Sequence, residues 1–253
     1  MGVIILTGGS RGIGRAIAEL LIRDPTGNKV VLTARSTGPL EELKKLAPER
    51  IAILAGDISD SKVAEQVVQT AVKEYGEISG LILNHGTLEP VRRIAELQVE
   101  EIQQAFLTNF SSGVYLAALA IPHLRKSKGR IVITSSGAAS NAYTGWGIYG
   151  ATKASQNHLA MTLAVEEPEI TTVAIRPGMV DTDMQKAIRE QHAKNMNPED
   201  MKKFTGAFES GQLVKPEDCG HVIAKLALSA TTDLSGKFMA WNDPALESYR
   251  LKK

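Results

Sequence analysis

Short apolar runs alternate with longer amphipathic stretches along almost the whole chain. Seven of the runs are rich in aliphatic residues, carry little internal charge and have the length of strands: Val3–Leu6, Lys29–Thr33, Ile51–Leu54, Gly80–Leu83, Arg130–Thr134, Thr171–Ile175 and Lys237–Ala240. Apolar runs without polar alternation are typical of strands that are covered on both faces. The pattern therefore predicts a parallel sheet buried between helices.

Helix-length stretches separate these runs: Gly12–Arg23, Pro39–Leu46, Lys62–Tyr75, Val99–Leu124, Tyr149–Val165 and Pro216–Leu228. Between Val63 and Val72, apolar residues recur at the spacing of one helical face. Repeated strand-helix-strand order favours right-handed crossovers. We therefore expect an α/β fold, a doubly wound parallel sheet with strand order 3-2-1-4-5-6-7, as a single domain over residues 1–253.

One segment breaks this rhythm. Asp181–Val214 is polar, is rich in Lys, Glu and Met, and lies between the last two predicted strands. It is too long for an ordinary connection. We interpret it as a partly helical, mobile lid that closes over a substrate, with a static surface excursion as the alternative.

Composition and charge exclude several functions. Lys and Arg total 29 and Asp and Glu total 28, and the basic runs are pairs, so we expect no nucleic-acid partner. A single cysteine, Cys219, fits a reducing compartment. We see no secretory signal and no apolar run approaching the ~18 residues of a membrane span. These features predict a cytoplasmic protein that does not bind membranes.

Two kinds of catalytic site are also excluded. The histidines His85, His123, His158, His192 and His221 have no ligand-like spacing, and no thiol cluster is present, so we expect no metal. The chain has no G-x-S-x-G pattern, which a serine hydrolase of the α/β type would need.

A glycine-rich turn follows the first predicted strand and opens the first helix. It reads Thr7-Gly8-Gly9-Ser10-Arg11-Gly12-Ile13-Gly14. A phosphate must approach the backbone closely in such a turn, where the free N–H groups of the helix start favour a pyrophosphate. This context predicts a dinucleotide site formed by Gly8, Ser10, Arg11, Gly12, Ile13 and Gly14.

The end of the second predicted strand indicates which dinucleotide binds. An acidic residue there would bind a free ribose 2′-hydroxyl and repel a 2′-phosphate. The chain instead has Ala34-Arg35-Ser36, and both Arg35 and Arg11 can reach this position. Because guanidinium groups suit phosphate oxygens, we expect the cofactor to be NADP(H).

Tyr149 and Lys153 stand four residues apart, and Ser136 lies thirteen residues before the tyrosine. Residues at i and i+4 share one face of a helix. A nearby cation lowers the pKa of a phenol, which is near ~10 when unperturbed. The three side chains therefore suit proton transfer at a carbonyl or alcohol oxygen. Ser135 is a competing candidate for the serine.

With the glycine turn, these residues make almost the whole chain resemble the short-chain dehydrogenase/reductase family. The resemblance implies that Tyr149 is the acid/base, that Lys153 also binds the nicotinamide ribose, and that Ser136 rather than Ser135 orients the substrate oxygen. It also implies that Asn109 distorts its helix and supports a water path to the lysine.

The same resemblance implies further cofactor contacts. They come from Asp57 and Ile58 at the adenine, Asn84 and Gly86 after the fourth strand, and Pro177, Gly178, Val180 and Thr182 after the sixth. His85 stands where the family usually has alanine. It is either a hydrogen-bonded structural residue or a ligand contact.

The substrate pocket is predicted less directly. Tyr143, Trp146 and Met184 would line an apolar cavity beside Ser136, and Phe204 and Phe208 are further candidates. Within the family the chain is similar to benzil reductases and sepiapterin-reductase-like enzymes. The likeness rests on residues 140–153, 181–185 and 241–246.

This resemblance implies an NADPH-dependent carbonyl reductase that accepts aromatic diketones. A 3-ketoacyl or sugar-alcohol oxidoreductase and a non-catalytic NADP(H)-binding sensor are the alternatives. Relatives pair through helices like Val99–Leu124 and Tyr149–Val165, so the resemblance also implies a homodimer or homotetramer.

Overall fold

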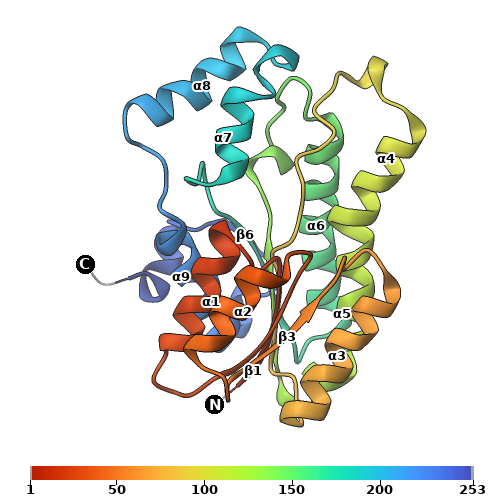
Figure 1. The fold of residues 1–253 in the computed structure, drawn as a ribbon, viewed down its shortest axis with the longest axis vertical. Helices are drawn as coiled ribbons and strands as arrows, with labels where there is room; N and C mark the ends of the chain where they lie inside the picture. The colour runs from red at the N-terminus through yellow and green to blue at the C-terminus, as the bar shows by residue number, and fades with distance from the viewer. Residues whose placement is uncertain (1, 252–253) are drawn as a thin grey trace.

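A sheet of seven parallel strands runs through the centre of the molecule in the computed structural model, which describes residues 2–251 (Figure 1). Its order is β3-β2-β1-β4-β5-β6-β7, as predicted. The strands are β1 (Val3–Thr7), β2 (Lys29–Ala34), β3 (Ile51–Ala55), β4 (Gly80–Leu83), β5 (Arg130–Thr134), β6 (Thr171–Arg176) and β7 (Phe238–Ala240). Each of the seven predicted strands is confirmed, and no end differs by more than one residue.

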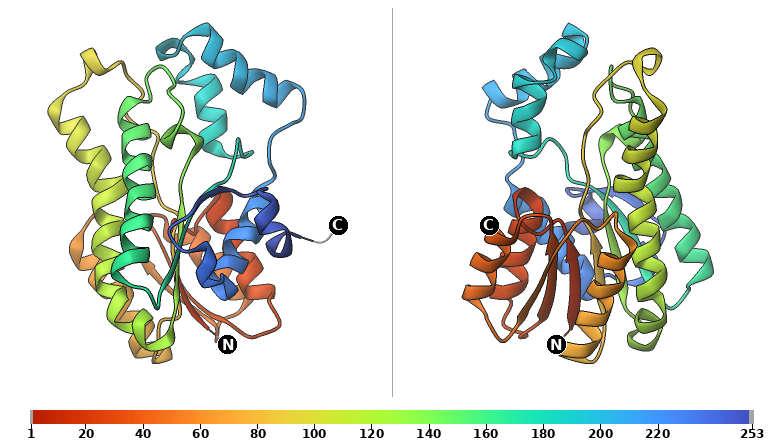
Figure 2. Two further views of the ribbon diagram at one scale, coloured as in Figure 1. Left: turned by 180° about the vertical axis from the view of Figure 1, so that it is seen from behind. Right: turned by 45° about the vertical axis from the view of Figure 1, so that its right-hand side comes forward.

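Helices cover both faces of this sheet (Figure 2). One face carries α1 (Gly12–Arg23), α2 (Thr37–Leu46) and α9 (Pro216–Ser229), and the other carries α3 (Ser61–Tyr75), α5 (Ser112–Ser127) and α6 (Gly147–Glu166). In β1, Ile4 and Leu6 belong to the first core, whereas Val3 and Ile5 belong to the second. Two covered faces explain why the strands show no polar alternation.

The helix predicted over Val99–Leu124 has an interruption. It begins as α4 (Val99–Phe106), passes through a π-helical turn (Leu107–Ser111) and continues as α5. The amide of Ser112 donates to the carbonyl of Leu107, five residues earlier. Asn109 lies in this turn, so the distortion that the family resemblance implied is present.

The continuous helix Val99–Ser127 is also long and apolar enough to cross a membrane by length and composition. From the sequence we expect no apolar run approaching ~18 residues, whereas this helix qualifies by its mean hydropathy of 1.3, to which the Leu, Ala and Ile residues of α5 contribute. The observation is weak evidence, because core helices of soluble proteins pass the same test. In this fold Leu116, Ala120 and Leu124 pack in the second core.

Residues 181–214 form a separate lobe above the carboxyl ends of the strands (Figure 1). The lobe contains α7 (Asp183–Glu190), a 3₁₀ turn (Ala193–Asn195) and α8 (Pro198–Glu209). Its two ends meet at an isolated β-bridge between Val180 and Val214. The chain therefore leaves the body of the protein and returns to it at one place.

Shorter 3₁₀ turns complete the described chain. They are Ile94–Glu96, Gly137–Ala139, Thr232–Leu234 and Pro244–Tyr249. The turn at Gly137–Ala139 directly follows β5 and Ser136, which places it at the same edge of the sheet as the glycine-rich turn.

Candidate active site

The glycine-rich turn between β1 and α1 has a backbone that requires glycine. Gly8 and Gly12 have φ angles of 66° and 53°, in the left-handed region. A Cβ on Gly14 would lie 2.0 Å from the carbonyl oxygen of Gly8. At the N-cap of α1, Arg11 makes no side-chain capping bond. The amides of Gly12, Ile13 and Gly14 at the helix start therefore suit an anionic group, and the turn fits the pyrophosphate of a dinucleotide.

The two arginines predicted for a 2′-phosphate are not equally placed. Arg35 is exposed directly after β2, beside the exposed Ser36. Arg11 instead forms an ion pair with Asp183 at the start of α7, with 3.1 Å between Nη1 and Oδ2. Both partners of this pair are about 71% exposed, so the pair is weak and easily exchanged.

Helix α6 carries the two residues central to the predicted chemistry. Tyr149 and Lys153 are both buried, and the lysine Nζ lies 5.8 Å from the centroid of the tyrosine ring. Ser136 follows β5 and its hydroxyl interacts with that of Tyr149. The hydroxyl of Ser135 instead donates to Asn157 Oδ1 at 2.6 Å. The structure thus brings Ser136, rather than Ser135, to the tyrosine.

Burial controls the charge state of both groups. It raises the pKa of Tyr149, and the hydrogen bond with Ser136 opposes that rise only in part. Burial lowers the pKa of Lys153 to about 8. The expectation that the lysine lowers the pKa of the tyrosine is wrong for the protein without cofactor. Lys153 Nζ donates to the carbonyl of Thr134 at 2.8 Å and to Gln156 Oε1 at 3.0 Å, away from the phenol.

Asn109 anchors the π-helical turn to the neighbouring loop. Its Oδ1 accepts from the amide of Thr87 at 2.8 Å, and its Nδ2 donates to the carbonyl of Thr87 at 2.9 Å. Its own carbonyl accepts from Gln156 Nε2 at 2.6 Å. Sequence reasoning missed Gln156, and the one signal was a polar residue three positions after Lys153 on the same helical face.

The turn after β4 lies against the glycine-rich turn. Asn84 Nδ2 lies 3.3 Å from the carbonyls of Thr7 and Gly8. The ring of His85 bridges two hydroxyls, with Nδ1 2.7 Å from Thr7 Oγ1 and Nε2 2.9 Å from Ser112 Oγ. Burial, with the nearby charge of Lys153, lowers the pKa of His85 to about 4. Since protein hydroxyls occupy both ring nitrogens, the contacts favour the structural interpretation.

The segment after β6 borders the glycine-rich turn on its other side. A Cβ on Gly12 would lie 3.1 Å from Thr182 Cγ2, and the hydroxyl of Thr182 donates to the carbonyl of Val180 at 3.3 Å. Pro177 is buried, and Gly178 has a φ of 83°. The segment after β6 thus lies beside the glycine-rich turn at Gly12.

Other predicted cofactor residues lie at the same edge of the sheet. Asp57 is exposed after β3, and its Oδ1 accepts from the amide of Ser59 at 2.9 Å. Ile58 is packed in the second core. A Cβ on Gly86 would lie 3.5 Å from Lys153 Nζ, so the glycine keeps the space beside the ammonium open.

Aromatic side chains cover the catalytic tyrosine. The ring of Trp146 meets that of Tyr149 edge to face, with 5.7 Å between the ring centroids. Tyr143 and Phe204 each lie 5.0 Å from Trp146 by the same measure. Phe204 comes from α8, so the lobe contributes directly to this cluster. The Nε1 of Trp146 is buried without a hydrogen-bond partner.

Two other predicted pocket residues lie outside the aromatic cluster. Met184 on α7 is 37% exposed and is absent from the apolar cluster around Tyr149. Phe208 is 52% exposed, with the guanidinium of Arg189 3.9 Å above its ring. Sequence position alone could not separate them from Phe204, because it does not show that Met184 lies on a different helix, α7, and that Phe208 occupies a different face of α8.

Polar contacts hold the lobe against the body. Asp200 Oδ2 accepts from the amide and the hydroxyl of Thr144, at 2.9 and 2.8 Å. Asn195 Nδ2 donates to the carbonyl of Val91 at 2.7 Å. The lobe is therefore packed against the loops near Tyr149 in this structure.

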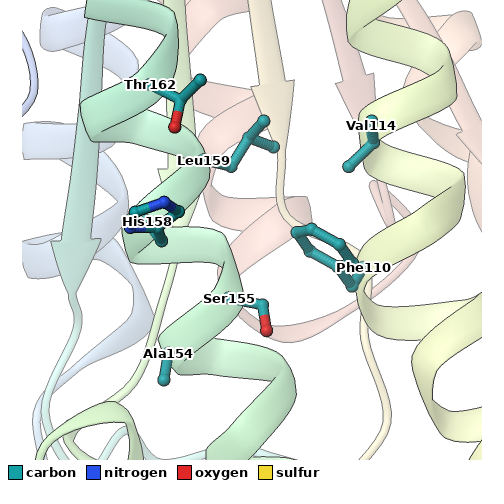
Figure 3. A pocket seen from close by; sticks show the side chains of 7 residues that line it. All are labelled: Phe110, Val114, Ala154, Ser155, His158, Leu159 and Thr162. Atoms are coloured by element: carbon teal, nitrogen blue, oxygen red, sulfur yellow. The ribbon is translucent and has the colours of Figure 1, made fainter.

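An apolar groove lies apart from this site, between α5 and α6 (Figure 3). It has a volume of about 500 Å³ and is lined by Phe110, Val114, Ala154, Ser155, His158, Leu159 and Thr162. Further along α6, Met161 and Val165 are 56% and 82% exposed. Within residues 2–251, no group of three or more His, Cys, Asp or Glu side chains is arranged to hold a metal ion.

Comparisons with known proteins agree with this geometry. Residues 2–193 match the family model described as short chain dehydrogenase. A crystal structure of a short-chain dehydrogenase/reductase from Saccharomyces cerevisiae superposes with a TM-score of 0.97, at 40% identity, over 99% of this chain and 100% of that one. A benzil reductase ((S)-benzoin forming) from the same yeast is 36% identical over 96% of this chain and 97% of its own.

A second solved structure, described as a cytoplasmic protein with unknown function from Saccharomyces cerevisiae, has a TM-score of 0.85 and 39% identity. It covers 99% of this chain and 100% of that chain. Both alignments therefore cover nearly all of this chain.

We expect pH to control the contribution of His85 to stability. Its folded pKa of about 4 lies below the ordinary value of 6.5, so folding favours the neutral ring. The stabilisation is complete above pH 6.5 and is lost as the pH falls toward 4. Between pH 7 and 4 the wild type should lose about 3 kcal/mol more unfolding free energy than His85→Ala. Denaturant unfolding of both proteins measures this, and equal losses would contradict it.

Proposed function

The chain belongs to the short-chain dehydrogenase family, and from this premise we propose that it is an NADPH-dependent carbonyl reductase. The observation that carries the proposal is the grouping of Ser136, Tyr149 and Lys153 beneath an aromatic cluster, at the edge of the sheet where the glycine-rich turn lies. The family consists of oxidoreductases that use nicotinamide dinucleotides, so the proposal concerns the phosphate form of the cofactor and the substrate.

The described residues fit such a cofactor. The glycine-rich turn leaves no room for a Cβ on Gly14, and it presents the start of α1 to a pyrophosphate. Arg35, exposed after β2 with no acidic neighbour, suits a 2′-phosphate. Arg11 would reach the phosphate only by exchanging its weak pair with Asp183. When bound, the cofactor supplies the hydride.

Tyr149 would act as the proton donor to the substrate oxygen. Burial raises its pKa, so the phenol is protonated at neutral pH and has a proton to give as the oxygen becomes negative. Ser136 would donate a hydrogen bond to the same oxygen and orient it. Lys153, whose ammonium also borders the open space at Gly86, would hold the ribose hydroxyls. The ammonium lies 5.8 Å from the centroid of the tyrosine ring and is hydrogen-bonded to Thr134 and Gln156, so it would stabilise the phenolate through its charge and not through a direct bond.

The pocket favours a ketone with aromatic groups and a second oxygen. Tyr143, Trp146 and Phe204 form an apolar surface at the tyrosine, and aromatic substrates stack on such rings. The unpartnered N–H of Trp146 is a donor that a second carbonyl oxygen would satisfy. An aromatic diketone such as benzil has both features, and a relative is named as a benzil reductase.

We also propose a second copy of this chain as a partner. The groove between α5 and α6, with exposed Met161 and Val165 nearby, is an apolar surface that helix pairing would cover (Figure 3). Sedimentation should give a dimer or tetramer, and a single-chain mass at micromolar concentration would exclude it.

The near balance of charges favours neither nucleic acid nor membranes as partners.

A cytoplasmic location is also part of the proposal. A solved relative is described as cytoplasmic, and the pKa of the one thiol, Cys219, is raised by burial to about 12, so it is unreactive. Fractionation of the source cells tests this location.

The reaction is tested by the loss of NADPH absorbance with a panel of carbonyl compounds. The panel should contain benzil, simple aromatic monoketones, a 3-ketoacyl thioester and a keto sugar. We expect benzil to be reduced fastest, and Tyr149→Phe to bind NADPH normally but to turn over about 100-fold more slowly. Faster reduction of the thioester or sugar would favour the alternative oxidoreductases. Ordinary turnover by Tyr149→Phe would remove the tyrosine from the mechanism.

Cofactor preference is tested at Arg35. The wild type should prefer NADPH over NADH by at least about tenfold in kcat/KM, or about 1.4 kcal/mol. Arg35→Asp should reverse the preference, because the carboxylate accepts from a free 2′-hydroxyl and repels a phosphate. Lys126→Asp makes the same charge change at the exposed far end of α5 and should leave the preference unchanged. Equal use of both cofactors by the wild type would contradict the assignment.

The lobe over residues 181–214 is proposed to be the substrate lid. Its ends meet at the Val180–Val214 bridge, and Phe204 packs on Trp146 above the tyrosine. Substrate entry requires these contacts to open, and binding of NADPH and product should favour the closed state. Hydrogen exchange should then show new protection within 181–214 on ligand binding but no change in α3. Unchanged exchange in the lobe, with normal activity, would identify it as a static excursion.

A further inference from the structure

The ammonium of Lys153 has two protein acceptors and therefore one free donor. A lysine ammonium carries three N–H groups. One bonds to the carbonyl of Thr134 at 2.8 Å and one to Gln156 Oε1 at 3.0 Å. A Cβ on Gly86 would lie 3.5 Å from Nζ, so this glycine leaves a third direction around the ammonium without a side chain. The direction of the remaining N–H is thus fixed by the other two bonds.

Gln156 is itself held in place at its other end. Its Nε2 donates to the carbonyl of Asn109 at 2.6 Å, and the side chain is only 3% exposed. Asn109 is in turn fixed by two bonds to Thr87. Because an amide has distinct donor and acceptor ends, the bond to Asn109 forces the oxygen of Gln156 toward Lys153.

We propose that Gln156 is a positioning residue, which orients the Lys153 ammonium toward the open space at Gly86 and occupies the carbonyl of Asn109. A neutral amide does not accept and pass on protons as water does. The water path from the lysine through Asn109, which the family resemblance implied, is therefore closed by a side chain in this protein. The ammonium therefore donates to a fixed side-chain oxygen, that of Gln156, where it would otherwise donate to water.

The groups that act on Lys153 come from its own helix and the turn after β4. Tyr149 lies on α6, with its ring centroid 5.8 Å from Nζ, and His85 interacts with the lysine charge from the β4 turn. His85 is neutral above about pH 4, so it does not titrate between pH 6 and 10. Loss of the Gln156 acceptor should destabilise the charged lysine and lower its pKa further below about 8.

The first test uses the wild-type protein without cofactor, so it does not depend on the proposed function. Lysine labelled with ¹³C at Cε reports the titration of Lys153 by NMR, with Lys153→Met identifying the signal. The side-chain amide of Gln156 should shift with the same midpoint, since the hydrogen bond to its oxygen is no longer charge-assisted once the lysine deprotonates. A Gln156 amide signal that stays constant through the lysine titration would overturn the proposal.

The second test compares Gln156→Met with the wild type and rests on the proposed function for its kinetic part. Methionine keeps the length of the side chain but removes both polar ends. The Lys153 midpoint and the basic limb of the kcat profile should both fall by about one pH unit, and the Kd for NADPH at pH 8 should rise about tenfold. Gln69→Met, at an exposed position of α3, is the matched control.

These outcomes separate the two proposals. A folded Gln156→Met protein with wild-type pH behaviour would show that Gln156 has only a packing role. Failure of every carbonyl substrate, with the shared NMR midpoint intact, would reject the carbonyl reductase but leave the role of Gln156 established. If Gln156→Met does not fold, the wild-type NMR titration still decides the question.

Discussion

The cost of burying a positive charge governs the arrangement of the candidate site. Lys153 is 4% exposed, and a buried ammonium is tolerated only when its hydrogens have acceptors. The carbonyl of Thr134, at the end of β5, is one acceptor for the ammonium, and Oε1 of Gln156, on α6, is the other. Gln156 can fill this role because the π-helical turn places the carbonyl of Asn109 within its reach. The distorted helix is thus part of the support for the charge and is linked to it through two hydrogen bonds.

The positive charge of Lys153 also disfavours a second positive charge nearby. A protonated histidine at position 85 would repel the ammonium, and burial together with the charge of Lys153 keeps this ring neutral by lowering its pKa to about 4. Thr7 lies in β1 just before the glycine-rich turn, and Ser112 lies at the start of α5. His85 therefore ties the turn to the helix that carries Asn109. Alanine, usual in the family, could not make this connection.

Much of the fold and the core of the site could be predicted because those features are local. The strands are short apolar runs, and the turn from Gly8 to Gly14 needs glycine wherever it occurs. Gln156 and Phe204 depend on contacts between distant segments, which no spacing along the chain reveals. The direction of the pKa shift at Tyr149 was missed for a similar reason. Spacing placed Lys153 on the same helical face, but it could not show that acceptors in β5 and α6 draw the ammonium away from the phenol, or that burial is the larger effect.

The bridge between Val180 and Val214 has a consequence for how such proteins diversify. Since both ends of the lobe are pinned at one point, the entropic cost of a longer or shorter excursion grows only with the logarithm of its length. Insertions, deletions and exchanges inside the lobe leave the register of the seven strands untouched. In this respect residues 181–214 form a unit that can be exchanged between two fixed ends. A lobe of a different length could therefore be joined at Val180 and Val214 with the seven-stranded sheet unchanged.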